Sequence, residues 1–232
     1  MIESMGSISA ECVRKMDQLD CAMHNIANAG TTGFKATMLF YIKGGEGVNQ
    51  PSEPHLTTDF TQGPIQRTGN ELDTAICGKG LFVIQTKDGF GYTRDGRFTL
   101  NKEGELVTLE GNFVMGKAGR ITVSGNDVRI NEKGAVLVDG AEVDTLRLAA
   151  FERPDQLDKC EGGIFLDTDD QAGLHEAKDS LIVPESLELS NVNSIQEMVK
   201  LIDIHRTFES YQKMMQTLQE QDKLSTTQIG KL

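Results

Sequence analysis

The sequence has no tryptophan, and aromatic residues make up only 6% of its 232 residues. It has 5 prolines and 4 cysteines, and no two cysteines form a Cys-x-x-Cys pair. This spacing argues against a zinc ribbon, a thioredoxin-like motif and a disulfide framework. We therefore expect buried or half-buried thiols. The cysteines are Cys12, Cys21, Cys77 and Cys160.

Basic charge is also scarce, with 23 Lys and Arg against 35 Asp and Glu, which gives a net charge of −12. A nucleic-acid-binding protein needs a basic stripe, so we expect no nucleic-acid partner. No stretch approaches the roughly 18 apolar residues of a membrane span. The first residues do not contain a basic segment followed by an apolar one, so we expect no cleaved Sec-type signal peptide.

Glycine, by contrast, is abundant, with 24 residues. Between residues 63 and 189, short strand-like runs alternate with turns that contain glycine. This pattern is typical of hairpins and antiparallel sheets. The turns are Lys87-Asp88-Gly89, Asp95-Gly96, Lys102-Glu103-Gly104, Leu109-Glu110-Gly111, Glu132-Lys133-Gly134 and Val138-Asp139-Gly140.

Residues 1–35 are predicted to form a helix with a sharp end. Apolar residues recur at steps of three and four, which predicts a narrow coiled-coil seam. Asn28-Ala29-Gly30 ends the pattern, and Gly30 is expected just past the helix in a left-handed conformation. Gly30 and Gly33 are the two positions here that can take a positive φ. The N-terminal seam consists of Ile8, Cys12, Met16, Leu19, Met23 and Ile26.

Residues 190–232 are predicted to form a second long helix. Two apolar rows with a period of seven interleave at steps of three and four, which again indicates a seam. Ser194 and Glu197 match the Ser-x-x-Glu capping box at a helix start. The C-terminal seam consists of Leu201, Ile204, Phe208, Tyr211, Met215 and Leu218.

These patterns predict an α+β protein in which long N- and C-terminal helices with coiled-coil seams flank an antiparallel, hairpin-rich β domain. Residues 36–62 contain Gly44-Gly45-Glu46-Gly47 and Pro51-Ser52-Glu53-Pro54. Little periodicity accompanies them, which predicts a partly irregular connector. The expected organisation is a terminal-helix domain from 1–35 and 190–232, a connector over 36–62 and a β-rich domain over 63–189.

Motifs for catalysis or metal binding are lacking. Asp167-Thr168-Asp169-Asp170 begins like a calcium loop, but Ala172 and Lys178 occupy the positions that need glycine and glutamate. Gly78-Lys79-Gly80 lacks the Ser or Thr that follows lysine in a phosphate loop. We therefore predict no catalytic residues, no metal and no cofactor. A β-rich binding module or enzyme that dimerises through its helices is the alternative from a different class.

Four sequence blocks carry a resemblance. Residues 24–35 read His-Asn-Ile-Ala-Asn-Ala-Gly-Thr-Thr-Gly-Phe-Lys, and residues 68–82 read Thr-Gly-Asn-Glu-Leu-Asp-Thr-Ala-Ile-Cys-Gly-Lys-Gly-Leu-Phe. Residues 92–98 read Tyr-Thr-Arg-Asp-Gly-Arg-Phe, and residues 187–193 read Leu-Glu-Leu-Ser-Asn-Val-Asn. In this order they resemble the signatures of bacterial flagellar axial proteins, the rod, hook and hook-associated subunits. His24 and Leu81 depart from the pattern of that family, as does the segment Met5–Glu11.

The resemblance implies a structural subunit of the flagellar rod that assembles helically and transmits torque. The short connector is more similar to the proximal-rod class, with the distal-rod class as the alternative. Implied partners are copies of the chain, other rod and hook subunits and the flagellar type III export apparatus. The implied location is the basal body, in a rod that crosses the periplasm. We expect assembly contacts from both seams and from a turn motif of Asn28, Gly30, Thr32, Gly33 and Phe34.

Overall fold

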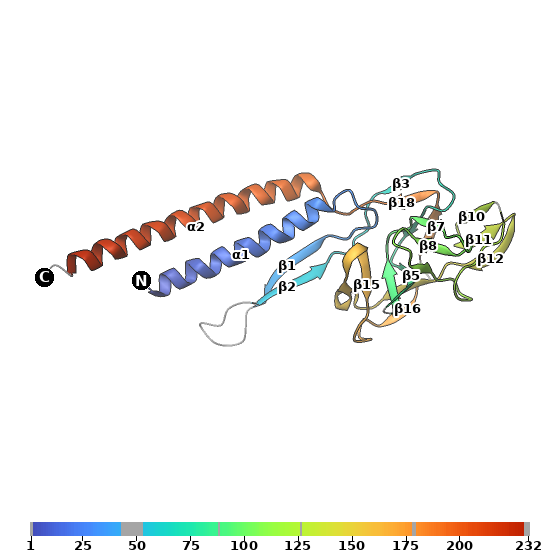
Figure 1. The fold of residues 1–232 in the computed structure, drawn as a ribbon, viewed down its shortest axis with the longest axis horizontal. Helices are drawn as coiled ribbons and strands as arrows, with labels where there is room; N and C mark the ends of the chain where they lie inside the picture. The colour runs from blue at the N-terminus through green and yellow to red at the C-terminus, as the bar shows by residue number, and fades with distance from the viewer. Residues whose placement is uncertain (1, 43–52, 88, 126, 178–179, 230–232) are drawn as a thin grey trace. The chain divides into compact units, whose positions relative to one another are not determined.

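The computed structural model describes residues 2–42, 53–87, 89–125, 127–177 and 180–229 (Figure 1). The chain divides into two compact units. The first, which we call the helical unit, comprises Met1–Ala27, Thr37–Thr57 and Asn193–Leu232. The second, the β-rich unit, comprises Asn28–Ala36 and Thr58–Val192.

The helical unit contains two long helices, α1 (Ile2–Ala27) and α2 (Ser194–Ile229). At 1.5 Å per residue the 36 residues of α2 extend over about 54 Å. Figure 1 shows α1 lying between α2 and a pair of strands, and α1 contacts both α2 and the first strand. The prediction of two terminal helices is confirmed.

The strand pair consists of β1 (Thr37–Ile42) and β2 (Glu53–Thr58). Both strands fall within the segment expected to be a partly irregular connector, so its ends are more regular than predicted. Gly44-Gly45-Glu46-Gly47 and Pro51-Ser52 lie outside the described residues. Side chains of β1 alternate between half-buried and exposed. This period of two means that only one face of the strand packs against the protein.

The largest sheet of the β-rich unit has nine strands, all of whose pairs are antiparallel. Its main path runs β14-β15-β6-β5-β9-β8-β7, and β13 pairs with both β5 and β16. The strands are β5 (Leu81–Thr86), β6 (Gly89–Thr93), β7 (Phe98–Leu100), β8 (Leu106–Thr108), β9 (Phe113–Val114), β13 (Leu148–Phe151), β14 (Asp158–Lys159), β15 (Ile164–Leu166) and β16 (Leu174–Glu176).

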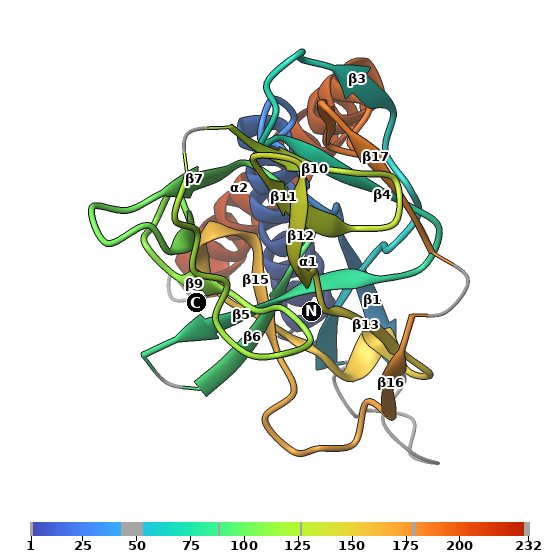
Figure 2. The ribbon, with the colours of Figure 1, turned by 90° about the vertical axis from the view of Figure 1, so that its right-hand side faces the viewer.

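Three smaller sheets complete this unit. β10 (Val128–Ile130), β11 (Ala135–Val138) and β12 (Ala141–Thr145) lie side by side, as Figure 2 shows. β17 (Leu181–Pro184) pairs with β4 (Thr74–Cys77), and β18 (Ser186–Glu188) pairs with β3 (Ile65–Arg67). These last two pairs bring the end of the β-rich segment back to its beginning. Two short 3₁₀ helices, Pro154–Gln156 and Glu161–Gly163, flank β14.

Several predicted glycine turns join consecutive antiparallel strands. Gly104 connects β7 to β8, Gly134 connects β10 to β11, and both have positive φ. In each of these turns an asparagine side chain accepts two backbone N–H groups, Asn101 in the first and Asn131 in the second. The prediction of antiparallel hairpins is confirmed, because glycine permits the left-handed residue that each turn requires.

The core of the β-rich unit comprises two apolar clusters. The first centres on Phe82, whose ring meets Phe98 edge-on with centroids 5.1 Å apart. The second centres on Phe165, which lies 5.0 Å from the ring of Phe60. β5 supplies both clusters, since Phe82 belongs to the first and Leu81 and Val83, which point to the other side of the strand, belong to the second.

The division of the chain differs from the expected boundaries after residues 35 and 62. Asn28–Ala36, which follow α1, are part of the β-rich unit. The Gly33 N–H donates to the Glu188 carbonyl at 2.7 Å, and the Asp59 N–H donates to the Ala36 carbonyl at 2.8 Å. Hydrogen bonds to distant segments therefore fix this stretch, rather than continuity with the preceding helix.

Candidate functional site

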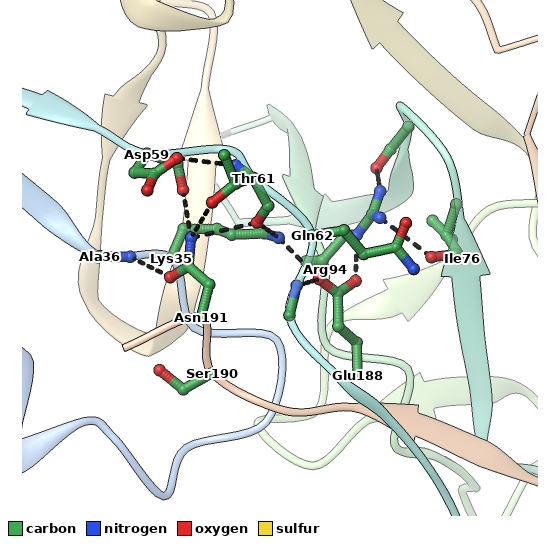
Figure 3. Close-up of polar contacts among 12 residues, drawn as sticks. Lys35, Ala36, Asp59, Thr61, Gln62, Ile76, Arg94, Glu188, Ser190 and Asn191 are labelled. Carbon is green, nitrogen blue, oxygen red and sulfur yellow. Dashed lines mark hydrogen bonds and ion pairs between the residues drawn. The ribbon is translucent and has the colours of Figure 1, made fainter. Parts of the chain in front are cut away.

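A buried ionic cluster in the β-rich unit joins Lys35, Arg94 and Glu188 (Figure 3). The Lys35 Nζ lies 2.7 Å from Glu188 Oε1, and the Arg94 Nε lies 2.5 Å from Glu188 Oε2. The three side chains are 1%, 4% and 0% exposed. Charges so deeply buried must be paired and hydrogen-bonded, because removal from water is otherwise very costly.

Backbone groups satisfy the remaining hydrogen-bonding capacity of the cluster. Lys35 also donates to the Thr61 carbonyl at 2.7 Å, and the Gly63 N–H donates to Glu188 Oε1 at 2.7 Å. Arg94 donates to three backbone carbonyls in the segment that runs from the end of β4 to the start of β5. Those carbonyls belong to Ile76, Gly78 and Gly80.

The cluster holds two cations and one anion. Carbonyl dipoles offset the excess positive charge in part, but burial lowers the pKa of Lys35 below its ordinary value despite the opposing effect of Glu188. The described hydrogen bonds of Lys35 and Arg94 go to Glu188 and to backbone carbonyls. The arrangement therefore suits a structural lock rather than chemistry on a substrate.

All four sequence blocks meet at this cluster. Lys35 ends the first block, Arg94 lies in the third, and Glu188 lies in the fourth. The second block supplies the carbonyls that Arg94 binds. No spacing within the four blocks predicts that these charged residues meet. The available signal was the single fully charged residue in the first block, Lys35, and in the fourth block, Glu188.

Phe34, next to Lys35, is buried beneath a lysine of β14. The Lys159 Nζ lies 3.8 Å from the centre of the Phe34 ring and donates to the Lys35 carbonyl at 2.6 Å. The ammonium thus combines a cation–π contact with a hydrogen bond. Gly33 is equally constrained, since its φ is +67° and a Cβ would lie 2.5 Å from the Asp95 nitrogen.

The other members of the predicted turn motif are less buried. Asn28 and Thr32 are half-buried, and the Thr31 N–H donates to the Asn28 carbonyl at 3.1 Å. Gly30 is exposed and is not among the glycines with positive φ. The expectation that Gly30 adopts the left-handed conformation is wrong. The chain turns instead at Gly33, where the backbone of Arg94 and Asp95 leaves no room for a side chain.

Within the helical unit, Asn25 connects α1 to β1. Its amide accepts the Thr37 N–H and donates to the Thr37 carbonyl, both at 2.8 Å. Asn25 therefore pairs with Thr37 as a neighbouring strand would. Tyr41, four residues further along β1, donates its hydroxyl hydrogen to the Arg14 carbonyl at 2.9 Å. One face of β1 is thus attached to α1 at both ends.

Asn191 makes a comparable contact in the β-rich unit (Figure 3). It accepts the Ala36 N–H at 2.8 Å and donates to the Asp59 carbonyl at 2.8 Å. It lies 3.1 Å from both the carbonyl and the hydroxyl of Thr61. A single amide side chain from the fourth block therefore joins the segments that follow α1 and β2.

The predicted N-terminal seam is covered unevenly in this single chain. Cys12 is buried, and Ile8, Leu19 and Ile26 are half-buried. Met16 and Met23 are exposed. The buried positions of α1 also include Ala22 and Asn25, which the seam omitted because α1 packs on two sides, against α2 and β1. A role of the seam in assembly stays a prediction.

The predicted C-terminal seam coincides with the covered side of α2. All of its members are half-buried, whereas most other described side chains of the helix are exposed. The helix start differs from the predicted capping box. Asn193, not Ser194, accepts the N–H groups of Ile195 and Gln196, and Glu197 pairs with Lys200 at 2.5 Å. The seam members are Leu201, Ile204, Phe208, Tyr211, Met215 and Leu218.

Two negative findings apply to the described residues alone. No group of three or more His, Cys, Asp or Glu side chains among them could bind a metal ion. No helix in the described part of the chain is both long and apolar enough to cross a membrane.

Comparison with known proteins identifies matches across most of the chain. Residues 75–138 match the flagellar hook protein FlgE/F/G D1 domain, and residues 183–227 match the flagellar basal body rod FlgEFG protein C-terminal domain. These two ranges contain the Arg94 and Glu188 ends of the buried cluster. The second range also contains all six residues of the predicted C-terminal seam.

Whole proteins match as well. The flagellar basal-body rod protein FlgF of Caulobacter vibrioides is 36% identical over 93% of this chain and 93% of its own length. FlgF of Rhizobium meliloti is 31% identical over 85% of this chain and 86% of its own length. The rod protein FlgG of Buchnera aphidicola subsp. Baizongia pistaciae is 29% identical over 84% of this chain and 87% of its own length. The chain therefore belongs to the family of flagellar basal-body rod proteins, structural and not enzymatic, in which it is most like FlgF and next most like FlgG.

Proposed function

We propose that this chain is a structural subunit of the proximal part of the flagellar rod, the place that the FlgF resemblance implies. Its similarity to FlgF over 93% of both chains supports the proposal most strongly. The distal rod is the second candidate, because an FlgG relative also matches over most of the chain. Assembly with other axial subunits follows from membership of the family.

Assembly is proposed to proceed through the terminal helices. Met16 and Met23 of the N-terminal seam remain exposed in a single chain, as do apolar residues elsewhere on the helical unit. Apolar burial stabilises an interface by about 25 cal/mol per Å². Neighbouring subunits would supply the missing cover, through heterologous contacts that repeat along a helical array.

The buried cluster is proposed to stiffen each subunit for torque. Lys35, Arg94 and Glu188 join segments from both ends of the β-rich unit through charge-assisted hydrogen bonds. A rod must transmit torque without local unfolding. Segments fixed at several buried points open less readily than those attached by exposed backbone bonds alone.

The proposed location is the rod of the basal body where it crosses the periplasm. Delivery through the flagellar type III export apparatus belongs to the same proposal. The proposed partners are copies of the chain and neighbouring rod and hook subunits.

Deletion of the gene tests the function directly. We expect non-motile cells without complete rods, and recovery of swimming when the chain is supplied from a plasmid. Basal bodies purified from the complemented strain should contain the chain by mass spectrometry. Complete basal bodies that lack the chain would refute the proposal. A binding module or enzyme dimerised by its helices would instead form a stable dimer of the purified chain in solution, without association with basal bodies.

A further inference from the structure

The helical unit carries an uncovered apolar row on the outer face of β1. Thr37 and Tyr41 of this strand bind α1, so the alternate residues point away from that helix. Those residues are between 39% and 56% exposed. We name them the strand patch, and they are Met38, Phe40 and Ile42.

A second apolar group lies on the outer face of α2. Its members are between 49% and 76% exposed and occupy the first three turns of the helix. Successive residues turn by about 100° around a helix, which places this group roughly opposite the centre of the half-buried C-terminal seam. Beyond it the same face becomes charged at Arg206, Glu209 and Lys213. We name the group the helix patch: Ile195, Met198, Val199 and Ile202.

The two patches lie on opposite outer faces of the helical unit, because α1 lies between α2 and β1 (Figure 1). We propose that the helix patch of one copy docks onto the strand patch of the next copy. The proposal rests on the proposed rod function and specifies which surfaces of two copies meet. Two different patches on opposite faces give a heterologous contact that repeats from copy to copy.

Charge at the edges of the patches favours this pairing over each patch meeting its own kind. Glu53 is the only residue of the described β1 and β2 strands with a full charge, and it is exposed. Arg206 lies one turn beyond Ile202 on the outer face of α2. Docking of the strand patch on the helix patch can bring Glu53 near Arg206, whereas the described β1 and β2 strands of a second copy contain no Lys or Arg that could pair with Glu53.

The size of the patches fits a subunit that associates only in an array. The helix patch contributes four side chains and the strand patch three, which falls well short of the 20 to 30 residues per side of a standard interface of about 1,600 Å². A single contact is therefore too small for a stable dimer in solution. In an array, each copy uses both patches at once, and the combined contacts raise the effective affinity.

Photo-crosslinking in assembled basal bodies tests the pairing. Phe40→p-benzoylphenylalanine, in a strain with no other copy of the gene, should give an adduct of twice the subunit mass after illumination. Peptide mapping should locate the second end within residues 194–203. The reciprocal variant, Ile195→p-benzoylphenylalanine, should give adducts on β1. An adduct within one chain or with a different protein overturns the pairing, as does the absence of adducts at both positions. Absence of the chain from basal bodies would instead refute the proposed rod function.

Charge substitutions supply an independent test. Phe40→Asp and Val199→Asp should each lower the amount of chain in purified basal bodies about tenfold or more, because docking would bury an unpaired carboxylate. Leu109→Asp is the matched control, since Leu109 is 58% exposed in the β-rich unit and should assemble normally. The double variant Phe40→Lys with Val199→Glu should assemble better than Phe40→Lys alone or Val199→Glu alone. Normal assembly of both aspartate variants overturns the proposal.

Discussion

Lys35 and Glu188 form a buried ion pair across 153 positions of sequence, with 2.7 Å between Nζ and Oε1. The contact joins the end of the first sequence block to the fourth. Arg94 binds the other carboxylate oxygen. Glu188 is therefore the one anion that two buried cations share, which makes it the most sensitive member of the cluster.

Glu188→Gln should lower the free energy of unfolding of the full chain by about 3–5 kcal/mol, because two buried cations lose their counter-charge. Urea denaturation followed by circular dichroism measures the loss. Glu185→Gln is the matched control, since its partner Arg67 is 79% exposed and such a pair contributes about 1 kcal/mol or less. Equal effects of the two substitutions would contradict the central role of Glu188.

Gly33→Val should destabilise the β-rich unit by at least about 2 kcal/mol, because a β-branched residue is strained at positive φ and its Cβ would meet the backbone of Arg94 and Asp95. A thermal melt followed by near-ultraviolet circular dichroism checks this. Gly30→Val is the control, since a Cβ there has nothing within 4 Å. An unchanged melting temperature for Gly33→Val would show that residues 28–36 are not integral to the unit.

Tyr41 should make the α1–β1 contact sensitive to alkaline pH. Burial raises the pKa of Tyr41 to about 12, and the nearby Asp17 carboxylate adds to the effect. Because the unfolded pKa is about 10, the folded state binds this proton more tightly. The resulting stability is present below pH 10 and is lost as the pH rises from about 10 through 12.

A spectroscopic titration measures this effect. The tyrosinate absorbance of the wild-type chain reports 3 tyrosines. Tyr41→Phe should remove one tyrosine equivalent from the late part of the curve and lessen the loss of stability above pH 10. Tyr92 remains as an internal reference, since burial raises its pKa as well. If Tyr41→Phe leaves the late part of the absorbance titration unchanged, the contact of Tyr41 with Arg14 and Asp17 is contradicted.

The features that sequence predicted are those with local causes. The half-buried row of α2 follows from apolar spacing alone, and the turns at Gly104 and Gly134 follow from the need for a left-handed residue. The buried cluster was missed because charge pairing over 153 positions has no periodic signal. The cap at Asn193 and the turn at Gly33 differ from prediction, since several neighbouring residues could serve and the surrounding backbone selects among them.

The apolar row of α2 leads to a prediction that separates loss of assembly from unfolding of the β-rich unit. Phe208 is half-buried in the helical unit, in the row that also contains Leu201 and Met215. Phe208→Asp should abolish swimming, because a carboxylate in an apolar contact costs several kcal/mol when left unpaired. Every copy in an array would repeat that cost. The β-rich unit, which has its own core around Phe82 and Phe165, should melt at an unchanged temperature.

A matched variant on the same helix controls for charge and helix propensity. Met214 is 50% exposed and lies outside the predicted seam. Met214→Asp adds the same charge one position before Met215, and we expect it to retain swimming. Soft-agar motility and a thermal melt of each purified chain make the comparison. Normal swimming of Phe208→Asp would contradict the seam as an assembly surface. Equal loss of swimming in both variants would mean that added negative charge, rather than the position of Phe208, disrupts assembly.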